Sequence, residues 1–274
     1  MTEILMATYN GAAYLTEQLE SLLSQTDQDW QLVVRDDGSS DETPVILQFY
    51  ARRMGARMRL LPGEGHIGCL KSYELLLRES RADYCLLADQ DDVWLPDKIR
   101  HARACMEATE AEIGKDTPII AYSDLLVTDA QLHVLGSYRE RVKLRPELLQ
   151  TPEQLAVNNY VTGCTMMLNR TAMEVALPLG EHALVHDAAI ALSVCARGGR
   201  LVDIGHADIL YRQHGDNSIG ATAVEKAPHY VWRKLTSLGR TLRQQQANYR
   251  QARDIIPITP IQFIRNRIHY LLQR

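Results

Sequence analysis

Three aspartates at positions 89–92 are the residues of this sequence best suited to chemistry. They stand in Asp89-Gln90-Asp91-Asp92, directly after the apolar run Leu86-Leu87-Ala88. Neighbouring carboxylates raise one another's pKa unless a cation neutralises them, and oxygen ligands suit a hard divalent ion. The segment therefore predicts a Mg²⁺ or Mn²⁺ site, although the same residues could form a solvated turn or cap the following helix.

A second acidic turn, Asp36-Asp37-Gly38-Ser39, follows another apolar run, Leu32-Val33-Val34. The polar loop Tyr9-Asn10-Gly11 follows a third, over residues 4–8. In parallel α/β sheets, ligands bind beyond the carboxyl ends of the strands. The three loops therefore predict one site, although one of Asp36 and Asp37 could instead cap the next helix.

The elements that must position these loops alternate along the chain. Strands are expected over 4–8, 32–35, 57–61 and 84–88, and helices over 13–24, around 45–50 and over 70–77. This alternation predicts an α/β fold, a parallel sheet with helices on both faces. Residues 161–168 are expected to return as a strand under the site, with Gly163 leaving room for a ligand.

Composition and missing motifs narrow the function. A chain of 274 residues, 46% hydrophobic and 23% charged, is typical of a folded enzyme. Since neither a leader nor a membrane-length apolar run is visible, a cytoplasmic protein is expected. Five cysteines without a Cys-x-x-Cys pair predict buried free thiols. No dinucleotide fingerprint or P-loop occurs, so a metal would have to hold any nucleotide diphosphate.

Eight segments in a fixed order carry a family resemblance. They are Ala7–Gly11, Ser24–Thr26, Arg35–Asp41, Gly68–Leu77, Asp89–Trp94, Val161–Met167, His186-Asp187 and Tyr211–His214. The sequence resembles inverting glycosyltransferases of family 2 with the GT-A fold, in particular bacterial enzymes that transfer rhamnose or related sugars in surface polysaccharide synthesis. The resemblance implies metal-dependent transfer from a dTDP- or UDP-sugar to a glycan or lipid-linked acceptor.

The resemblance also implies roles for single residues. Tyr9 would offer an aromatic surface to the base, and Asp37 would accept the imide proton of uracil or thymine. Asp91 would bind the metal directly, assisted by Asp89 and His214. The implied nucleotide-sugar contacts are Thr8, Tyr9, Asn10, Asp36, Asp37, Lys71, Asp89, Gln90 and Asp91, and the implied acceptor contacts are Trp94, Gly163 and His186. Lys71 could equally be a solvated lysine on the first turn of a helix.

Inverting transfer needs one base, and Asp187 is the candidate. It precedes the apolar run 188–192, which would place it at a helix N-terminus facing the cleft; the alternative is that it only caps that helix. Relatives usually carry bulky aromatic residues after this aspartate, where Ala188 and Ala189 stand here. The departure puts the acceptor contacts in doubt rather than the base.

The net charge of −4 is divided unevenly. Residues 226–274 hold ten Lys or Arg and one acid, which gives +9 and leaves −13 for residues 1–225. We expect a GT-A domain over 1–220, with a nucleotide-binding half (1–100) and an acceptor-binding half (101–220), and a basic amphipathic helical extension over 221–274. The extension could lie on an anionic membrane at the inner face, or pack on the catalytic domain or a second subunit.

The charge pattern and the residue set also bear on two other classes of function. A nucleic-acid partner is not expected, because the acidic body lacks a basic groove with interleaved aromatic residues. The alternative to an enzyme is a GT-A-like module that binds a nucleotide or glycan without turnover. The joint presence of Asp37, Asp91, Asp187 and His214 favours the enzyme, since a binding module needs no base.

Overall fold

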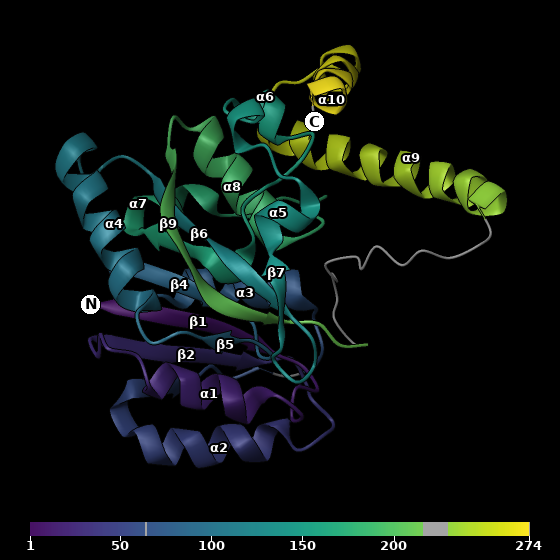
Figure 1. Ribbon diagram of the computed structural model, residues 1–274. Helices are drawn as coiled ribbons and strands as arrows, with labels where there is room; N and C mark the ends of the chain where they lie inside the picture. The colour runs from purple at the N-terminus through teal and green to yellow at the C-terminus, as the bar shows by residue number, and fades with distance from the viewer. Residues whose placement is uncertain (64, 216–229, 274) are drawn as a thin grey trace.

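The parallel part of the sheet is built from the N-terminal strands of the computed structural model (Figure 1). Strands β1 (Thr2–Thr8), β2 (Trp30–Asp36), β3 (Met58–Leu60) and β4 (Tyr84–Ala88) lie in the order β3-β2-β1-β4, and all three pairings are parallel. The four predicted strands are therefore confirmed. The structure describes residues 1–63, 65–215 and 230–273, with the backbone alone for 230–242.

The remaining described strands extend the sheet beyond β4. They are β5 (Val93–Trp94), β6 (Ile119–Thr128), β7 (Val134–Ser137), β8 (Met166–Asn169) and β9 (Arg200–Arg212). Strand β8 runs antiparallel to both β4 and β6, whereas β6 and β9 are parallel. The sheet is thus mixed rather than wholly parallel.

Helices cover both faces of the sheet, as the sequence predicts. One face is covered by α1 (Leu15–Leu23), α2 (Thr43–Met54) and α4 (Lys98–Ile113), and the other by α3 (Cys69–Glu79), α7 (Arg170–Ala176) and α8 (His186–Ala196). Successive strand residues point to opposite faces, so Leu5 and Leu87 enter one core and Met6 and Leu86 the other. The short helices α5 (Tyr138–Val142) and α6 (Pro152–Leu155) complete this part of the chain.

The C-terminal segment forms α9 (Tyr230–Ile255) and α10 (Pro260–Gln273). Residues 256–259 separate the two helices, and Pro260 opens α10, where its missing N–H costs no helical hydrogen bond. Ala252, Ile256, Ile258, Phe263 and Tyr270 are buried in the core beside α8. Part of the expected extension over 221–274 lies outside the described residues, as does the proposed boundary at 220/221, and no side chains are described for 230–242.

The helix expected around residues 45–50 is α2, whose buried face is formed by Thr43, Leu47, Tyr50 and Met54, so that Val45 and Phe49 are exposed. Two details of the sequence interpretation are wrong. Residues 161–168 are not one strand: Gly163–Thr165 form a 3₁₀ turn before β8. Of the five free thiols only Cys85 and Cys164 are buried, while Cys69 is exposed.

Candidate functional site

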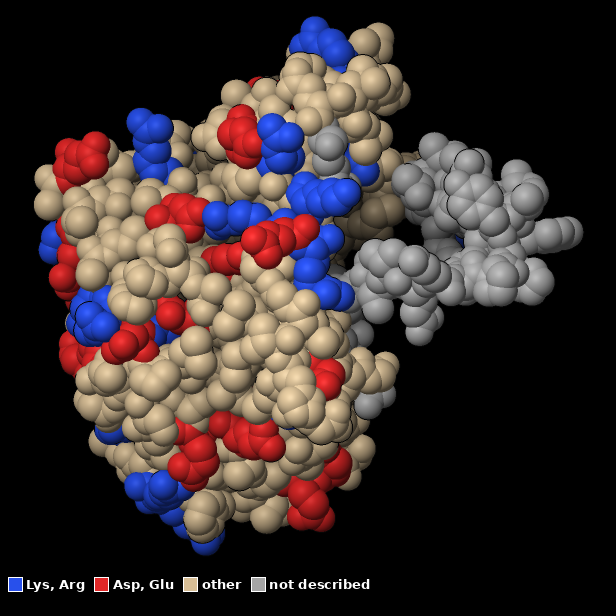
Figure 2. Space-filling view, viewed as in Figure 1, with Lys and Arg blue, Asp and Glu red and all other residues tan. Residues whose placement is uncertain are grey.

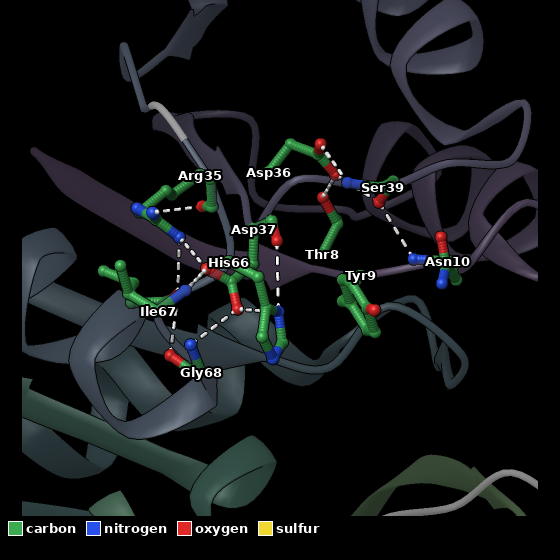
Figure 3. Close-up of polar contacts among 12 residues, drawn as sticks. Thr8, Tyr9, Asn10, Arg35, Asp36, Asp37, Ser39, His66, Ile67 and Gly68 are labelled. Carbon is green, nitrogen blue, oxygen red and sulfur yellow. Dashed lines mark hydrogen bonds and ion pairs between the residues drawn. The ribbon is translucent and has the colours of Figure 1, made fainter.

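The first acidic turn is held by its own side chains, at the paired ends of β1 and β2. Asp36 accepts hydrogen bonds from the Thr8 hydroxyl at 2.8 Å and from the Ser39 hydroxyl and backbone N–H at 2.6 and 3.0 Å (Figure 3). Thr8 is buried. The two predicted contact residues therefore bind each other and fix the turn after β2.

Asp37 lies deeper and accepts hydrogen bonds from several donors. Its carboxylate receives the N–H groups of Ile67 and Gly68, both at 2.8 Å, forms an ion pair with Arg35, and lies 2.9 Å from Nδ1 of His66 (Figure 3). Burial raises its pKa, but the hydrogen bonds from Ile67, Arg35 and Gly68 outweigh burial, so the pKa lies below its usual value. A nucleobase that binds here would therefore meet a charged hydrogen-bond acceptor that already has four donors: Arg35, His66 and the two backbone N–H groups.

His66 is a residue of this pocket that the sequence did not single out. Its ring lies 4.4 Å from the exposed ring of Tyr9, and half of its side chain is open to solvent. Of the four donors on Asp37, it is the one a base could most easily replace. His66 lies in an irregular loop after Pro62-Gly63, where no sequence pattern predicts its contact with Asp37.

Three other predicted donor contacts are engaged by the protein itself. Both ends of the Gln90 amide bind the Tyr9 backbone, at 2.8 and 3.0 Å. Asn10, in a left-handed conformation (φ 48°), accepts the Ser40 N–H at 2.8 Å. The Lys71 ammonium pairs with Glu74 at 2.8 Å on the first turn of α3. Gln90 and Asn10 therefore fix the loop that carries Tyr9.

The second acidic cluster follows β4. Burial, followed by the charges of Asp91 and Asp187, raises the pKa of Asp89 to about 7. Asp92 is fully buried, accepts the Arg212 N–H at 3.2 Å and has a pKa raised well above its usual value, chiefly by burial. Asp89 also lies near Asp92 and Cys164, but a buried thiol is a poor ligand for a hard ion.

His214 reaches this cluster from the end of β9. Its Nε2 lies 2.8 Å from Oδ2 of Asp91, and its ring lies 4.5 Å from that of Tyr14. Together with the partly exposed carboxylates of Asp89 and Asp91, it supplies oxygen and imidazole groups of the kinds that bind Mn²⁺ or Mg²⁺, with the imidazole paired to Asp91 in this structure. A bound cation would offset the like charges of Asp91 and Asp187, which raise the pKa of Asp89 after the larger effect of burial.

Arg212 is a second residue whose role sequence reasoning missed. Its buried guanidinium donates to the carbonyl of Asp91 at 3.0 Å and of Ala130 at 2.7 Å, and pairs with Glu17. The group also lies over the Tyr14 ring, 4.7 Å from its centroid. Arg212 thus fixes the backbone of the acidic loop to β9 and α1.

The predicted base lies on the first turn of α8. Asp187 accepts the N–H groups of Ala188 and, at 3.3 Å, Gly163. Burial raises its pKa to about 6. Asp187 is not the N-cap residue of α8, because the helix begins at His186 and its N-cap residue is Val185, but its carboxylate does accept an N–H group of the first turn.

His186 connects α8 to the acidic cluster. Its ring stacks on Tyr73, with centroids 3.9 Å apart, and the Tyr73 hydroxyl donates to Asp89 at 3.3 Å. Burial lowers the pKa of His186 to about 4, so the ring is neutral at neutral pH. A Cβ at Gly163 would lie 2.5 Å from Nε2 of His186. In this structure, the room at Gly163 is therefore occupied by His186.

Trp94 is the predicted acceptor contact that the fold contradicts. Its side chain is 2% exposed in the core between α1 and α4, and the Lys98 ammonium lies over its ring at 4.6 Å. A buried indole cannot touch an acceptor. Trp94 supports the strand after the acidic loop instead.

Comparison of the sequence with known families gives one match over more than half of the chain. The model of the family "Glycosyl transferase family 2" matches residues 3–175. The dTDP-rhamnosyl transferase RfbG of Shigella flexneri is 26% identical over 243 residues, which are 82% of this chain and 76% of that protein. A shorter match, 30% identical over 100 residues (36% of this chain and 38% of that protein), is to the UDP-Glc:alpha-D-GlcNAc-diphosphoundecaprenol beta-1,3-glucosyltransferase WfgD of Escherichia coli.

Solved structures share the fold at lower identity. TarS 1–349 of S. aureus in complex with UDP-GlcNAc gives a TM-score of 0.60 at 16% identity, covering 90% of this chain and 70% of that one. The mannosyltransferase PcManGT of Pyrobaculum calidifontis, in complex with GDP-Man and Mn²⁺, also gives 0.60, at 19% identity, covering 98% and 68%. The fold expected from the sequence is therefore confirmed.

Proposed function

The chain belongs to glycosyl transferase family 2, and on this premise we propose that it transfers a sugar, with inversion, from a dTDP- or UDP-sugar to a glycan or lipid-linked acceptor. One observation carries the proposal. His186, the residue before the proposed base, stacks on Tyr73 with ring centroids 3.9 Å apart, and the Tyr73 hydroxyl donates to Asp89 at 3.3 Å, so the first turn of α8 lies against a residue that contacts the acidic cluster.

The donor would bind between the two acidic turns. The Tyr9 ring offers a stacking surface for the nucleobase. Asp37 supplies a charged acceptor for the imide proton of that nucleobase once the His66 ring moves away from the carboxylate. Asp91, Asp89 and His214 would hold Mn²⁺ or Mg²⁺. Such an ion would neutralise the diphosphate as it leaves.

Asp187 would act as the base. As the acceptor hydroxyl attacks the anomeric carbon, its proton passes to the Asp187 carboxylate, and the bond to the diphosphate breaks with its electron pair on oxygen. A pKa of about 6 leaves this carboxylate ionised at neutral pH and able to take a proton. Neutral His186 beside it adds no charge that would compete for the proton.

The finer substrate assignment rests on the relatives. A dTDP-rhamnosyl transferase covers most of this chain at 26% identity, which supports rhamnose as the sugar and a role in surface polysaccharide (O-antigen or capsule) synthesis. The printed name of the Escherichia coli relative includes a diphosphoundecaprenol acceptor, which supports a lipid-linked one here.

A thermal-unfolding screen of nucleotide-sugars with and without Mn²⁺ tests the donor class, because a ligand that binds only the folded state raises its stability. We expect dTDP- and UDP-sugars to protect best, and only with the metal. Strongest protection by GDP-sugars would contradict the role given to Asp37. Metal-dependent protection without transfer to any acceptor would favour the non-catalytic binding module.

A further inference from the structure

The outward face of α10 is apolar. Among the described residues, five exposed large apolar side chains lie on this one helix: Ile261, Ile264, Ile268, Leu271 and Leu272, which are 52–82% exposed. At about 100° per residue they fall within one arc of the helix. We call these five residues the α10 stripe.

The opposite face of α10 is fixed to the protein. Phe263 and Tyr270 are buried in the core, and Asn266 and Arg267 donate to the carbonyls of Glu153 and Val157, both at 3.1 Å. The helix cannot rotate its stripe inward without giving up these contacts. The stripe therefore stays on the surface.

The surroundings of the stripe are basic. Arg265 is exposed beside it, and residues 255–274 contain two further arginines and no acid. In Figure 2 the surface over α10 is mostly uncharged, with a basic side chain at its upper edge. An apolar arc bordered by arginine is the pattern of a helix that lies in a membrane interface.

We propose that α10 docks on a bilayer surface that carries anionic head groups, with the α10 stripe in the interface and Arg265 at the head groups. None of the described helices is long and apolar enough to cross a bilayer, so α10 would lie in the plane of the membrane. The proposal is independent of the proposed catalysis, since the stripe contains none of the site residues.

A second copy of the chain is the competing occupant. Specific protein interfaces take about 20–30 residues from each partner, far more than one stripe of five supplies. Symmetric pairing of two stripes would also bring the two basic tails together. Both arguments favour the lipid surface.

Vesicle flotation with the full chain tests the proposal. Phosphatidylcholine vesicles with and without phosphatidylglycerol are compared at low and high salt, and we expect binding to the anionic vesicles that weakens as salt rises. The variant Ile261→Gln/Ile264→Gln/Ile268→Gln should lower partitioning at least about tenfold. The matched control Val45→Gln/Phe49→Gln removes equally exposed apolar groups from α2 and should leave partitioning unchanged.

A second variant covers the case in which the triple variant does not fold. Arg265→Gln should lower partitioning at low salt about fivefold. Absent or charge-independent vesicle binding by the unaltered chain would overturn the proposal. So would a dimer in solution that the triple variant dissociates while vesicle binding is unaffected. Mn²⁺-dependent protection by nucleotide-sugars should persist in the triple variant, so failure here leaves the donor site untouched.

Discussion

Asp37 and Asp89 both follow strands of the same sheet, yet their pKa values move in opposite directions. Asp37 is surrounded by Arg35 and two backbone N–H groups, so its charge is stabilised despite burial. Asp89 is buried beside the like charges of Asp91 and Asp187, so its charge is disfavoured. The like charges gather where we place the metal and the catalytic base, whereas Asp37 stays ionised as the acceptor that we assign to the nucleobase of the donor.

Replacing the proposed catalytic base, Asp187, should slow the chemical step without changing donor binding. Asp187→Asn keeps the shape and removes the proton acceptor, so we expect turnover to fall by about 10²–10⁴-fold while donor affinity stays. Steady-state transfer kinetics and calorimetric donor titration measure the two quantities. Asp254→Asn, which alters a carboxylate paired with His182 away from the site, is the control. Near-normal turnover in Asp187→Asn would show that Asp187 is not the catalytic base.

The same residue predicts a pH dependence. Burial raises the pKa of Asp187 to about 6, and a base must be ionised to work. Protonation below that pH therefore inactivates it, and kcat/KM should fall about tenfold per pH unit on the acid side. The acid limb should be absent from the residual activity of Asp187→Asn. A kcat/KM that stays constant between about pH 5 and about pH 8 would contradict the role of Asp187 as the catalytic base.

Residue types and order in the chain predicted which side chains meet, but not how each is used. Asp36, Asp37, Asp89 and Asp91 were found because strand-end carboxylates are a local pattern. Trp94 was misread because its burial depends on distant partners in the core between α1 and α4. The hydrogen bonds of Gln90 to the Tyr9 backbone could not be predicted either, because the two residues are 81 positions apart. His66 and Arg212 were missed for the same reason, since their contacts lie 29 and 121 residues away.

At the scale of elements, the end of β9 organises the acidic loop. Its last residue holds the Asp91 carbonyl and the Asp92 carboxylate, and His214 follows two residues later. The N-terminal βα units could be predicted because their hydrophobic periodicity is local. The β6–β9 pairing, some 80 residues apart in sequence, left no such signal.

A substitution of Arg212, the last residue of β9, tests whether this strand positions the acidic loop. Arg212→Lys keeps the charge but loses the planar fork, so the bonds to Asp91, Ala130 and Glu17 cannot all be kept. We expect a stability loss of about 1–3 kcal/mol and weaker Mn²⁺ binding, measured by chemical unfolding and metal titration. Arg100→Lys, at an exposed pair on α4, is the control. Unchanged metal affinity in Arg212→Lys would show that β9 does not position the loop.

At the scale of the whole molecule, the C-terminal segment belongs to the fold and also presents a surface of its own. The charge difference predicted that residues 226–274 have a separate task, and the periodicity predicted helices. Which apolar residues turn inward could not be predicted, because both arcs of α10 carry them. Only contacts with α6 and the core separate Phe263 and Tyr270 from the stripe.

Two alanine substitutions on α10 compare the contribution of its buried face to stability with that of its exposed face. Phe263→Ala removes a buried ring and should cost about 3–5 kcal/mol of unfolding free energy. Ile261→Ala removes an exposed side chain and should change stability by no more than about 0.5 kcal/mol. Chemical denaturation of both variants gives the comparison. Equal, small effects would mean that α10 does not contribute to the folded core.

The metal-bridged donor site is tested by calorimetric titration of dTDP and UDP into the unaltered chain and into Asp91→Asn, each in the presence and absence of Mn²⁺. We expect metal-dependent binding that Asp91→Asn abolishes without loss of the fold. Asp83→Asn, an exposed carboxylate just before β4 and far from its site end, should bind as the unaltered chain does. Undiminished, Mn²⁺-dependent affinity in Asp91→Asn would contradict a metal-bridged donor site at this edge of the sheet.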